Sequence, residues 1–469
     1  MAEPSPPTAD QVQQEARDLI QEIYGVTLSG QSKAFYVPLQ FFAVVWGIEQ
    51  TDNEELFRHI NDQNPLRFIQ RSHDFARRLL NGNEIREERK RGITEDAETL
   101  RVLGKVFDAL TVKFEFQKEN AHPNRRHLQP YLGELIHHDF APVRGGGSPD
   151  ADGLGLERVY YRGGGTLVYE LLRADKKERR DQIAAELRKL LAGSNDPLGR
   201  TAEILHSADA VAPSSFTDTA LRPHIEDRET LWAEHLREGT FRILTSSSSR
   251  YKKIDHLMHW LPYCVARHLV ERAYSTLGIT EESPTPVDTG AEGAVRRASQ
   301  TKFREHRNAI RKAVVVAAGS ASDNEASDRV RQMLHHEEFP DLDFRKKKKV
   351  EKTLTANGDF FATTMSTIGA LNANTGLRHY TLKLPLLESI VHATVDKDAP
   401  IDFEDFCTEI LCRKLRLVVD PASGQKESVT AWTDNEDLER NACGLADRLD
   451  ALGLITSYSD ATRKVGPRR

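Results

Sequence analysis

The C-terminal part of the chain, from Leu377 onward, repeats apolar residues at the three- and four-residue spacing of helices. This pattern restricts the fold more than any other feature of the sequence. Predicted helices begin at Pro385, Asp402 and Asp434, and two short apolar runs follow them at 454–458 and 461–465. Three helices followed by a two-stranded ribbon predict a winged-helix-like domain over residues 356–469.

Helical periodicity also dominates the rest of the chain, so the predicted fold class is mainly α, multi-domain, with one small β-hairpin. A chain of 469 residues is long enough for roughly two to four domains. Stretches rich in Pro, Gly and polar residues mark the boundaries between them. The predicted divisions are an N-terminal helical domain (1–116), a linker (117–156), a middle domain of hairpin and helices (157–280), a basic helical segment with a mobile loop (281–355) and the C-terminal domain (356–469).

Four local predictions rest on short stretches of sequence. Alternating apolar residues at 156–161 and 166–172 flank Gly163–Gly165, which predicts a hairpin turn rather than a helix start. Pro262 suits the first turn of a helix, so it divides 254–260 from 263–277. The segment 65–80 predicts a helix, and the aromatic segment 34–48 predicts part of a hydrophobic core.

Targeting signals and cysteine usage bear on the compartment. The sequence has no apolar run of about 18 residues that could cross a bilayer. Its N-terminus lacks the basic and apolar regions of a signal peptide. The four cysteines form no CxxC pair and suit a reducing environment, mostly as small core residues: Cys264, Cys407, Cys412 and Cys443. We therefore expect a cytoplasmic protein.

Charge is distributed unevenly along the chain. The net charge is −6, yet residues 240–312 contain 13 Lys and Arg against 7 Asp and Glu. Within this region a predicted helix, 295–318, places four arginines on one face. A second basic run, 246–253, leads into a helix N-terminus. The candidate nucleic-acid-binding residues are Arg296, Arg297, Lys302, Arg304, Arg307, Arg311 and Lys312 on the helix, with Arg250, Lys252 and Lys253 on the second run.

The basic helix has two interpretations. Such a stripe can contact several phosphates, which predicts salt-dependent binding to a nucleic-acid backbone. Alternatively, it is a solvated face or an intramolecular partner of acidic segments.

The third C-terminal helix carries the opposite charge. Between residues 434 and 450 six acids face only two bases, so a DNA phosphate would be repelled. Asp434 and Asp437 are explained by capping and by the helix dipole. The other acids are not: Glu436, Glu439, Asp447 and Asp450. We therefore expect this domain to contact a protein partner.

Catalytic motifs are missing from the sequence. It contains no phosphate-binding ATPase loop, nucleophile elbow or HExxH string, so no catalytic residue and no cofactor are predicted. Candidate metal ligands lie together at His256, His259, Cys264 and His268, where packing is the alternative interpretation. Candidate nuclease residues are Asp341 and Asp343 before Arg345 and Lys346, Glu157 with Glu170, or Arg331 with His336.

Short segments near the C-terminus resemble a known class of proteins. The segments 369–372, 378–380 and 457–461 resemble the end of accessory, non-ATPase proteins of bacterial anti-phage defence systems, over about a fifth of the chain. The resemblance implies a subunit that works beside a separate ATPase, nuclease or methyltransferase. The leading hypothesis is a non-catalytic, DNA-binding subunit of such an antiviral complex. The alternatives are a divergent metal-dependent nuclease and a protein scaffold that binds no nucleic acid.

Overall fold

The structure is a computed structural model of the whole chain. It describes residues 7–28, 34–51, 55–59, 66–71, 97–112, 128–136, 140–143, 155–158, 163–193, 196, 198–200, 210–216, 230–290, 293–320, 325–335, 344–372, 377–426, 433–458 and 462–467.

The fold is mainly α, as predicted, with only short strands among the described residues. The chain forms two compact units that interleave along the sequence. Ala34 marks a division inside the stretch 1–116, for which a single domain is predicted. Unit 1 comprises Met1–Ala34, Pro223–Ser247 and Asp255–Arg469, and unit 2 comprises Phe35–Arg222 and Ser248–Ile254.

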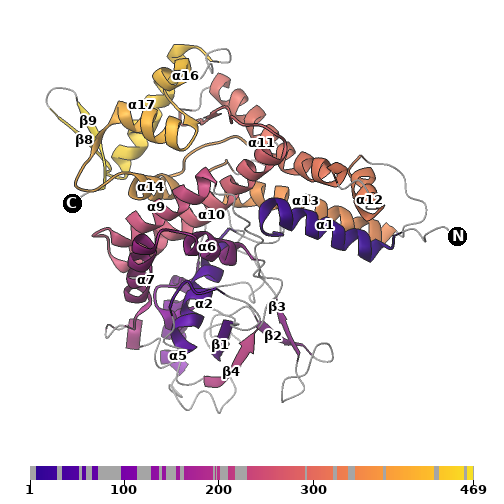
Figure 1. Cartoon of the computed structure of the whole chain (residues 1–469). Coiled ribbons are helices and arrows are strands. Elements are labelled where there is room, and N and C mark those ends of the chain that lie inside the picture. Colours follow the sequence, from indigo (N-terminus) through magenta and orange to yellow (C-terminus); the bar gives the residue numbers. More distant parts are fainter. Residues whose placement is uncertain are drawn as a thin grey trace. The chain divides into compact units, whose positions relative to one another are not determined.

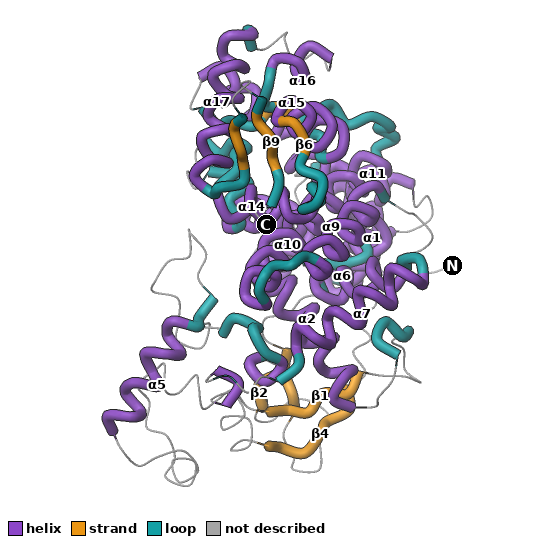
Figure 2. The backbone as a smooth tube through the Cα atoms, turned by 90° about the vertical axis from the view of Figure 1, so that its left-hand side faces the viewer, coloured by secondary structure: helices purple, strands orange, loops and turns teal. Residues whose placement is uncertain are grey.

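Unit 2 contains helices and two antiparallel strand pairs (Figures 1 and 2). Leu66 pairs with Phe216 in the first sheet, and Phe140 pairs with Arg158 in the second. The described helices are α2 (Tyr36–Thr51), α5 (Ala97–Ala109), α6 (Gly164–Arg173) and α7 (Lys177–Leu191), and the strands are β1 (Leu66–Arg71), β2 (Phe140–Val143), β3 (Gly155–Arg158) and β4 (Ala210–Phe216).

The predicted hairpin around Gly163–Gly165 is wrong, because these glycines begin helix α6. Gly163 is the N-cap residue in the left-handed region, with φ 92°. A Cβ on Gly165 would lie 2.3 Å from the backbone N of Phe41 on α2. The Gly165 N–H donates to Oε1 of Gln40 at 2.9 Å. Glycine is therefore required here for close helix packing.

Two further predictions in unit 2 have clear outcomes. Residues 66–71 form strand β1 instead of the predicted helix, because they pair with the distant β4. Pairing with this distant strand outweighs the local preference of the segment for a helix. The aromatic segment is confirmed as core: Phe35, Phe41 and Phe42 are all buried.

Gly165→Ala should destabilise the protein by about 1–3 kcal/mol, the usual cost of overpacking. Its Cβ meets the backbone of α2, which cannot rotate aside as a side chain can. Urea unfolding, followed by circular dichroism, measures this difference. Gly293→Ala is the matched control, because the nearest atom lies 3.7 Å from its added Cβ. Equal stability of the two variants would contradict the packing argument.

In unit 1 the N-terminal helix packs against three helices from the second half of the chain (Figure 1). The Tyr24 hydroxyl donates to the Ile310 carbonyl at 2.6 Å, and Asn357 accepts from the Leu28 N–H at 2.7 Å. The N-terminal helix is capped by Thr8, whose hydroxyl accepts from the Gln11 N–H. The helices involved are α1 (Ala9–Tyr24), α11 (Gly293–Ser320), α12 (Glu325–Leu334) and α13 (Phe344–Thr367).

Pro262 does not divide its helix as predicted. Helix α10 (Arg250–Thr276) passes through it without a break. Proline removes one backbone hydrogen bond and crowds the preceding turn. Leu261, Val265 and Leu269 are fully buried around it, so packing offsets the loss. Helix α9 (Leu231–Thr245) precedes α10 and is capped by Thr230, whose Oγ1 accepts from the Ala233 N–H.

The C-terminal elements include a three-stranded sheet of order β6–β9–β8, part of which Figure 2 shows. The predicted ribbon is confirmed as the β8–β9 pair, whereas the winged-helix domain as a whole stays a prediction. The elements in chain order are α14 (Leu384–Thr394), β6 (Ile401–Asp402), α15 (Phe403–Asp405), the π-helix η4 (Phe406–Lys414), β7 (Leu417–Val418), α16 (Pro421–Lys426), α17 (Asn435–Ala451), β8 (Ile455–Ser457) and β9 (Arg463–Val465).

Asn441, fully buried on α17, joins the C-terminal elements to the rest of unit 1. Its side-chain oxygen accepts from the N–H groups of Thr289 and Gly290, at 2.7 and 3.0 Å. Its amide donates to the carbonyls of Val287 and Val419. Strand β5 (Thr285–Pro286) begins this connecting segment and pairs in parallel with β7. All the hydrogen-bonding capacity of the amide is thus used.

A buried ion pair lies at the centre of unit 1. Nη2 of Arg267, which is wholly buried, donates to Oε1 of Glu282 at 2.6 Å. The guanidinium also lies over the ring of Trp232, 5.0 Å from its centroid. Burial acts to raise the pKa of Glu282, but Arg267 outweighs it and holds that pKa well below its ordinary value. The pair therefore remains charged.

His306 and Tyr380 extend this ion pair. Nε2 of His306 lies 3.1 Å from Oε1 of Glu282, which favours the tautomer with the proton on Nε2. Nδ1 then accepts from the Tyr380 hydroxyl. Burial lowers the pKa of His306 to about 4, against the effect of Glu282, so the imidazole is neutral at pH 7. Glu282, His306 and Tyr380 are ordered like an acid–base relay. Because His306 and Tyr380 are buried and Glu282 is nearly so, we assign these groups a structural role.

Arg267→Met should lower the free energy of unfolding by about 3–5 kcal/mol, because it leaves a carboxylate buried without its partner. The double variant Arg267→Met/Glu282→Leu should recover much of this loss, since it removes both charges. Urea unfolding of both proteins measures the difference. The exposed Lys177–Asp181 pair is the control, and Lys177→Met should leave stability unchanged within error. A double variant no more stable than the single one would contradict the prediction.

Candidate functional site

Helix α11 carries seven of the predicted nucleic-acid-binding residues, and the structure engages four of them internally. Lys302 is buried and donates to the Ser283 hydroxyl at 2.8 Å. The other three contacts are Arg296 with Asp288 at 2.8 Å, Arg307 with Asp359 at 2.9 Å and Arg311 with the Leu334 carbonyl at 2.8 Å. The alternative interpretation, internal partnership, thus holds for more than half of the set.

The remaining three residues, Arg297, Arg304 and Lys312, form what we call the α11 cationic row. All three are exposed and have no ion-pair partner within the described part of the chain. Thr301 and Asn308 complete the row at steps of three and four residues, so the five side chains share one helical face. At 1.5 Å rise per residue the cations lie about 10–12 Å apart along the axis. The row is a series of separated positive charges, and exposed Glu305, which pairs with Lys302 at 3.4 Å, lies beside it.

The second basic run, 250–253, forms the first turn of α10 and belongs to unit 2. Arg250 donates to the Lys189 carbonyl at 3.5 Å, and Tyr251 stacks edge-on against Tyr131. Burial lowers the pKa of Lys253. Lys252 is exposed, and its N–H donates to the Ser249 hydroxyl at 3.4 Å. This run therefore has fewer groups to offer a phosphate than its sequence suggests.

The four predicted metal ligands do not converge on one point, because they follow one another along α10. His268 Nδ1 accepts from the Thr230 hydroxyl at 3.1 Å, and His259 Nδ1 donates to the Asp255 carbonyl at 2.9 Å. Cys264 is fully buried, and burial raises the pKa of its thiol well above the ordinary value. Among the described residues these four side chains therefore do not gather into one metal-binding group.

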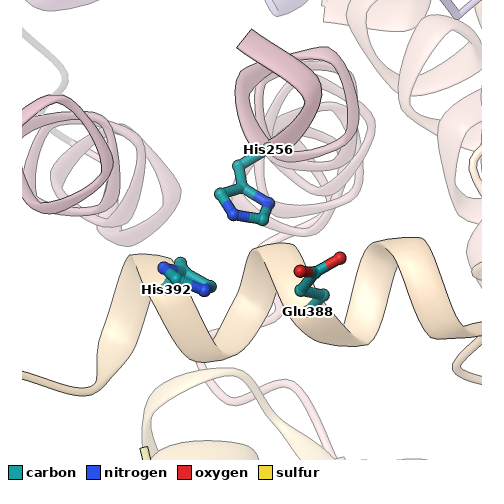
Figure 3. Close-up of side chains that lie close together, drawn as sticks. All are labelled: His256, Glu388 and His392. Carbon is teal, nitrogen blue, oxygen red and sulfur yellow. The ribbon is translucent and has the colours of Figure 1, made fainter. Parts of the chain in front are cut away.

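His256 instead meets two residues of α14 that the sequence analysis missed. Figure 3 shows Glu388 and His392 on successive turns of α14, with His256 reaching toward them from α10. One ligand atom from each of the three side chains lies within 4.8 Å of the others. The two imidazoles are stacked, with centroids 4.2 Å apart and planes at 23°. The Glu-x3-His spacing was the signal in the sequence, since residues four apart share a helix face.

Some acidic residues of α17 have partners within the chain and others are exposed, as is true of the bases on α11. Asp434 caps the helix, accepting from the Asp437 N–H at 2.8 Å as predicted, and Asp437 pairs with Arg440 at 2.7 Å. The remaining exposed acids follow helical spacing along one face: Glu436, Glu439, Asp447 and Asp450. We call these four residues the α17 acidic face. Glu436 lies 3.6 Å from Arg440, and the other three keep their charge toward solvent.

The predicted nuclease residues form no site within the described residues. Glu170 lies on α6 and pairs with Arg173 at 2.7 Å, and Arg331 pairs with Asp328 at 2.7 Å. Arg345 and Lys346 are exposed in the first turn of α13. The other members lie outside the described residues or have side chains that are not described: Glu157, His336, Asp341 and Asp343.

Comparisons of the chain with protein-family models, with curated proteins and with solved structures find no match. Among the helices described, none is long and apolar enough to cross a membrane. The geometry of the chain is therefore the basis for a functional proposal.

The lowered pKa of buried His268 predicts how the stability of the protein depends on pH. Burial lowers the pKa of His268 to about 3, from 6.5 in the unfolded chain. Between these values the unfolded state binds a proton that the folded state does not, so stability is lost as pH falls below 6.5. His268→Gln should remove up to about 1.4 kcal/mol per pH unit from this acid dependence. The measurement is urea unfolding at pH 8, 6, 5 and 4.

Gln at position 268 retains an acceptor for the Thr230 hydroxyl, so the variant should match the natural protein at pH 8. His335→Gln is the control, because His335 is exposed on the last turn beyond α12. Parallel pH profiles for the natural protein and His268→Gln would refute the assignment of a neutral, buried His268.

Proposed function

We propose that this chain binds a nucleic-acid backbone through the α11 cationic row, as a non-catalytic subunit of a larger complex. The supporting observation is the exposure of Arg297, Arg304 and Lys312 on one face, where none of them forms an ion pair with a residue that the structure describes. Arginine and lysine on an exposed helix face attract phosphates without reading base sequence. The binding is therefore of low sequence specificity.

The second half of the proposal concerns a protein partner. The α17 acidic face would repel nucleic acid and attract a basic protein surface. The resemblance of the C-terminal fifth to accessory proteins of anti-phage defence systems supports a partner of the ATPase, nuclease or methyltransferase class. In this proposal the chain brings such an enzyme to DNA and performs no chemistry itself.

The number of exposed cations in the row predicts how steeply binding depends on salt concentration. Three phosphate contacts give a slope of about −2.7 in a plot of log Kobs against log salt for duplex DNA, and about −2 for a single strand. Engagement of all seven α11 cations would instead give a slope near −6, by the same relation. Fluorescence anisotropy with a labelled 20-base-pair duplex, titrated across salt concentrations, measures this slope. We expect the smaller value.

The triple variant Arg297→Ala/Arg304→Ala/Lys312→Ala should abolish most of the binding and flatten the salt dependence. Its matched control is Lys176→Ala/Lys177→Ala/Lys189→Ala on α7, which removes three exposed charges elsewhere. Absence of binding by the natural protein would favour the scaffold alternative. Equal losses in both triple variants would show that total charge, and not the row, governs binding. Either result would refute the proposal.

A further inference from the structure

The cluster of His256, Glu388 and His392 lies inside unit 1, apart from the α11 cationic row. It joins α10 to α14, two helices more than a hundred residues apart in the sequence. His256 is 2% exposed, whereas the two residues of α14 are half-buried. Two imidazoles and one carboxylate thus gather where water reaches one side of the group.

The donor set suits one class of metal ion. Imidazole nitrogen with a single carboxylate oxygen is typical of Zn²⁺, whereas Ca²⁺ and Mg²⁺ prefer sites built of oxygen ligands alone. Three protein ligands leave a tetrahedral ion one further position, which solvent can fill from the half-buried side. No described cysteine belongs to the group, so the ion it suits is of borderline softness.

The present distances are close to those a metal needs. Two ligand atoms on a tetrahedral Zn²⁺ stand about 3.3 Å apart, given bonds of about 2.0–2.1 Å. The atoms of this group lie within 4.8 Å of one another, so binding brings them closer by rotating side chains about their χ angles. Glu388 and His392, at i and i+4, already share one face of α14 and need no backbone change.

We propose that His256, Glu388 and His392 bind one Zn²⁺ ion, which cross-links α10 to α14 with water as the fourth ligand. The ion would hold the helix that opens the C-terminal elements against α10.

The test uses the full chain with any affinity tag removed. After dialysis against EDTA and then buffer, the protein should take up about one equivalent of Zn²⁺, measured by elemental mass spectrometry. Its melting temperature should rise by several degrees with zinc and fall back with chelator. Mg²⁺ at the same concentration should leave the melting temperature unchanged.

Three single variants assign the ligands. His256→Gln, Glu388→Gln and His392→Gln should each reduce zinc uptake to below about 0.2 equivalents under the same competition. His268→Gln is the matched control, since it removes another buried histidine of α10 and should retain full uptake. Glu388→Gln is nearly isosteric at a half-buried position, so it keeps the test valid even if His256→Gln fails to fold.

Two results would overturn the site. One is natural protein that takes up less than about 0.2 equivalents with no change in melting temperature. The other is Glu388→Gln that binds zinc as fully as the control. Because the α11 cationic row lies outside this cluster, DNA binding should survive Glu388→Gln, so failure of the zinc site and failure of the proposed function are distinguishable.

Discussion

The ion pair between Arg267 and Glu282 is the constraint on which unit 1 depends. A buried guanidinium must keep its carboxylate partner, since losing it would leave a charge in a medium of low polarity. The pair ties α10 to the segment that leads into α11. Through His306 and Tyr380 it also reaches the segment that leads into α14. Elements from three regions of the sequence are therefore placed around one charge pair.

The same principle explains why a basic sequence does not become an equally basic surface. Lys302 and Arg311 lie on α11 among exposed cations, yet they serve the interior by bonding Ser283 and a carbonyl of α12. Helical periodicity places charges on a face, but it does not say which face another helix covers. The packing of α12, α13 and the segment 281–290 on α11 separates the structural cations from those of the row.

Sequence reasoning succeeded where the signal was local and failed where it was not. The helices α11 and α17 follow apolar periodicity, Asp434 caps α17, and the β8–β9 ribbon follows its two short runs. The predictions at Gly163–Gly165 and at Pro262 were wrong. Close contact with α2 overrides the local preference at the glycines, and burial of α10 overrides it at Pro262. Glu388 and His392 were visible as a spacing on a predicted helix, but their meeting with His256 depends on a contact between helices 130 residues apart.

Helix α11, which carries the cationic row, packs against α17, which carries the acidic face. Val295, near the start of α11, packs with Leu438 of α17 in a cluster that also includes Cys412 and Val418. Asn441 and Arg448 anchor α17 further, to the backbone of Thr289 and Leu382. The α11 cationic row and the α17 acidic face therefore belong to one compact unit. Under the proposed function, the acidic face would repel a nucleic acid bound on the row, which leaves that face for a basic protein surface.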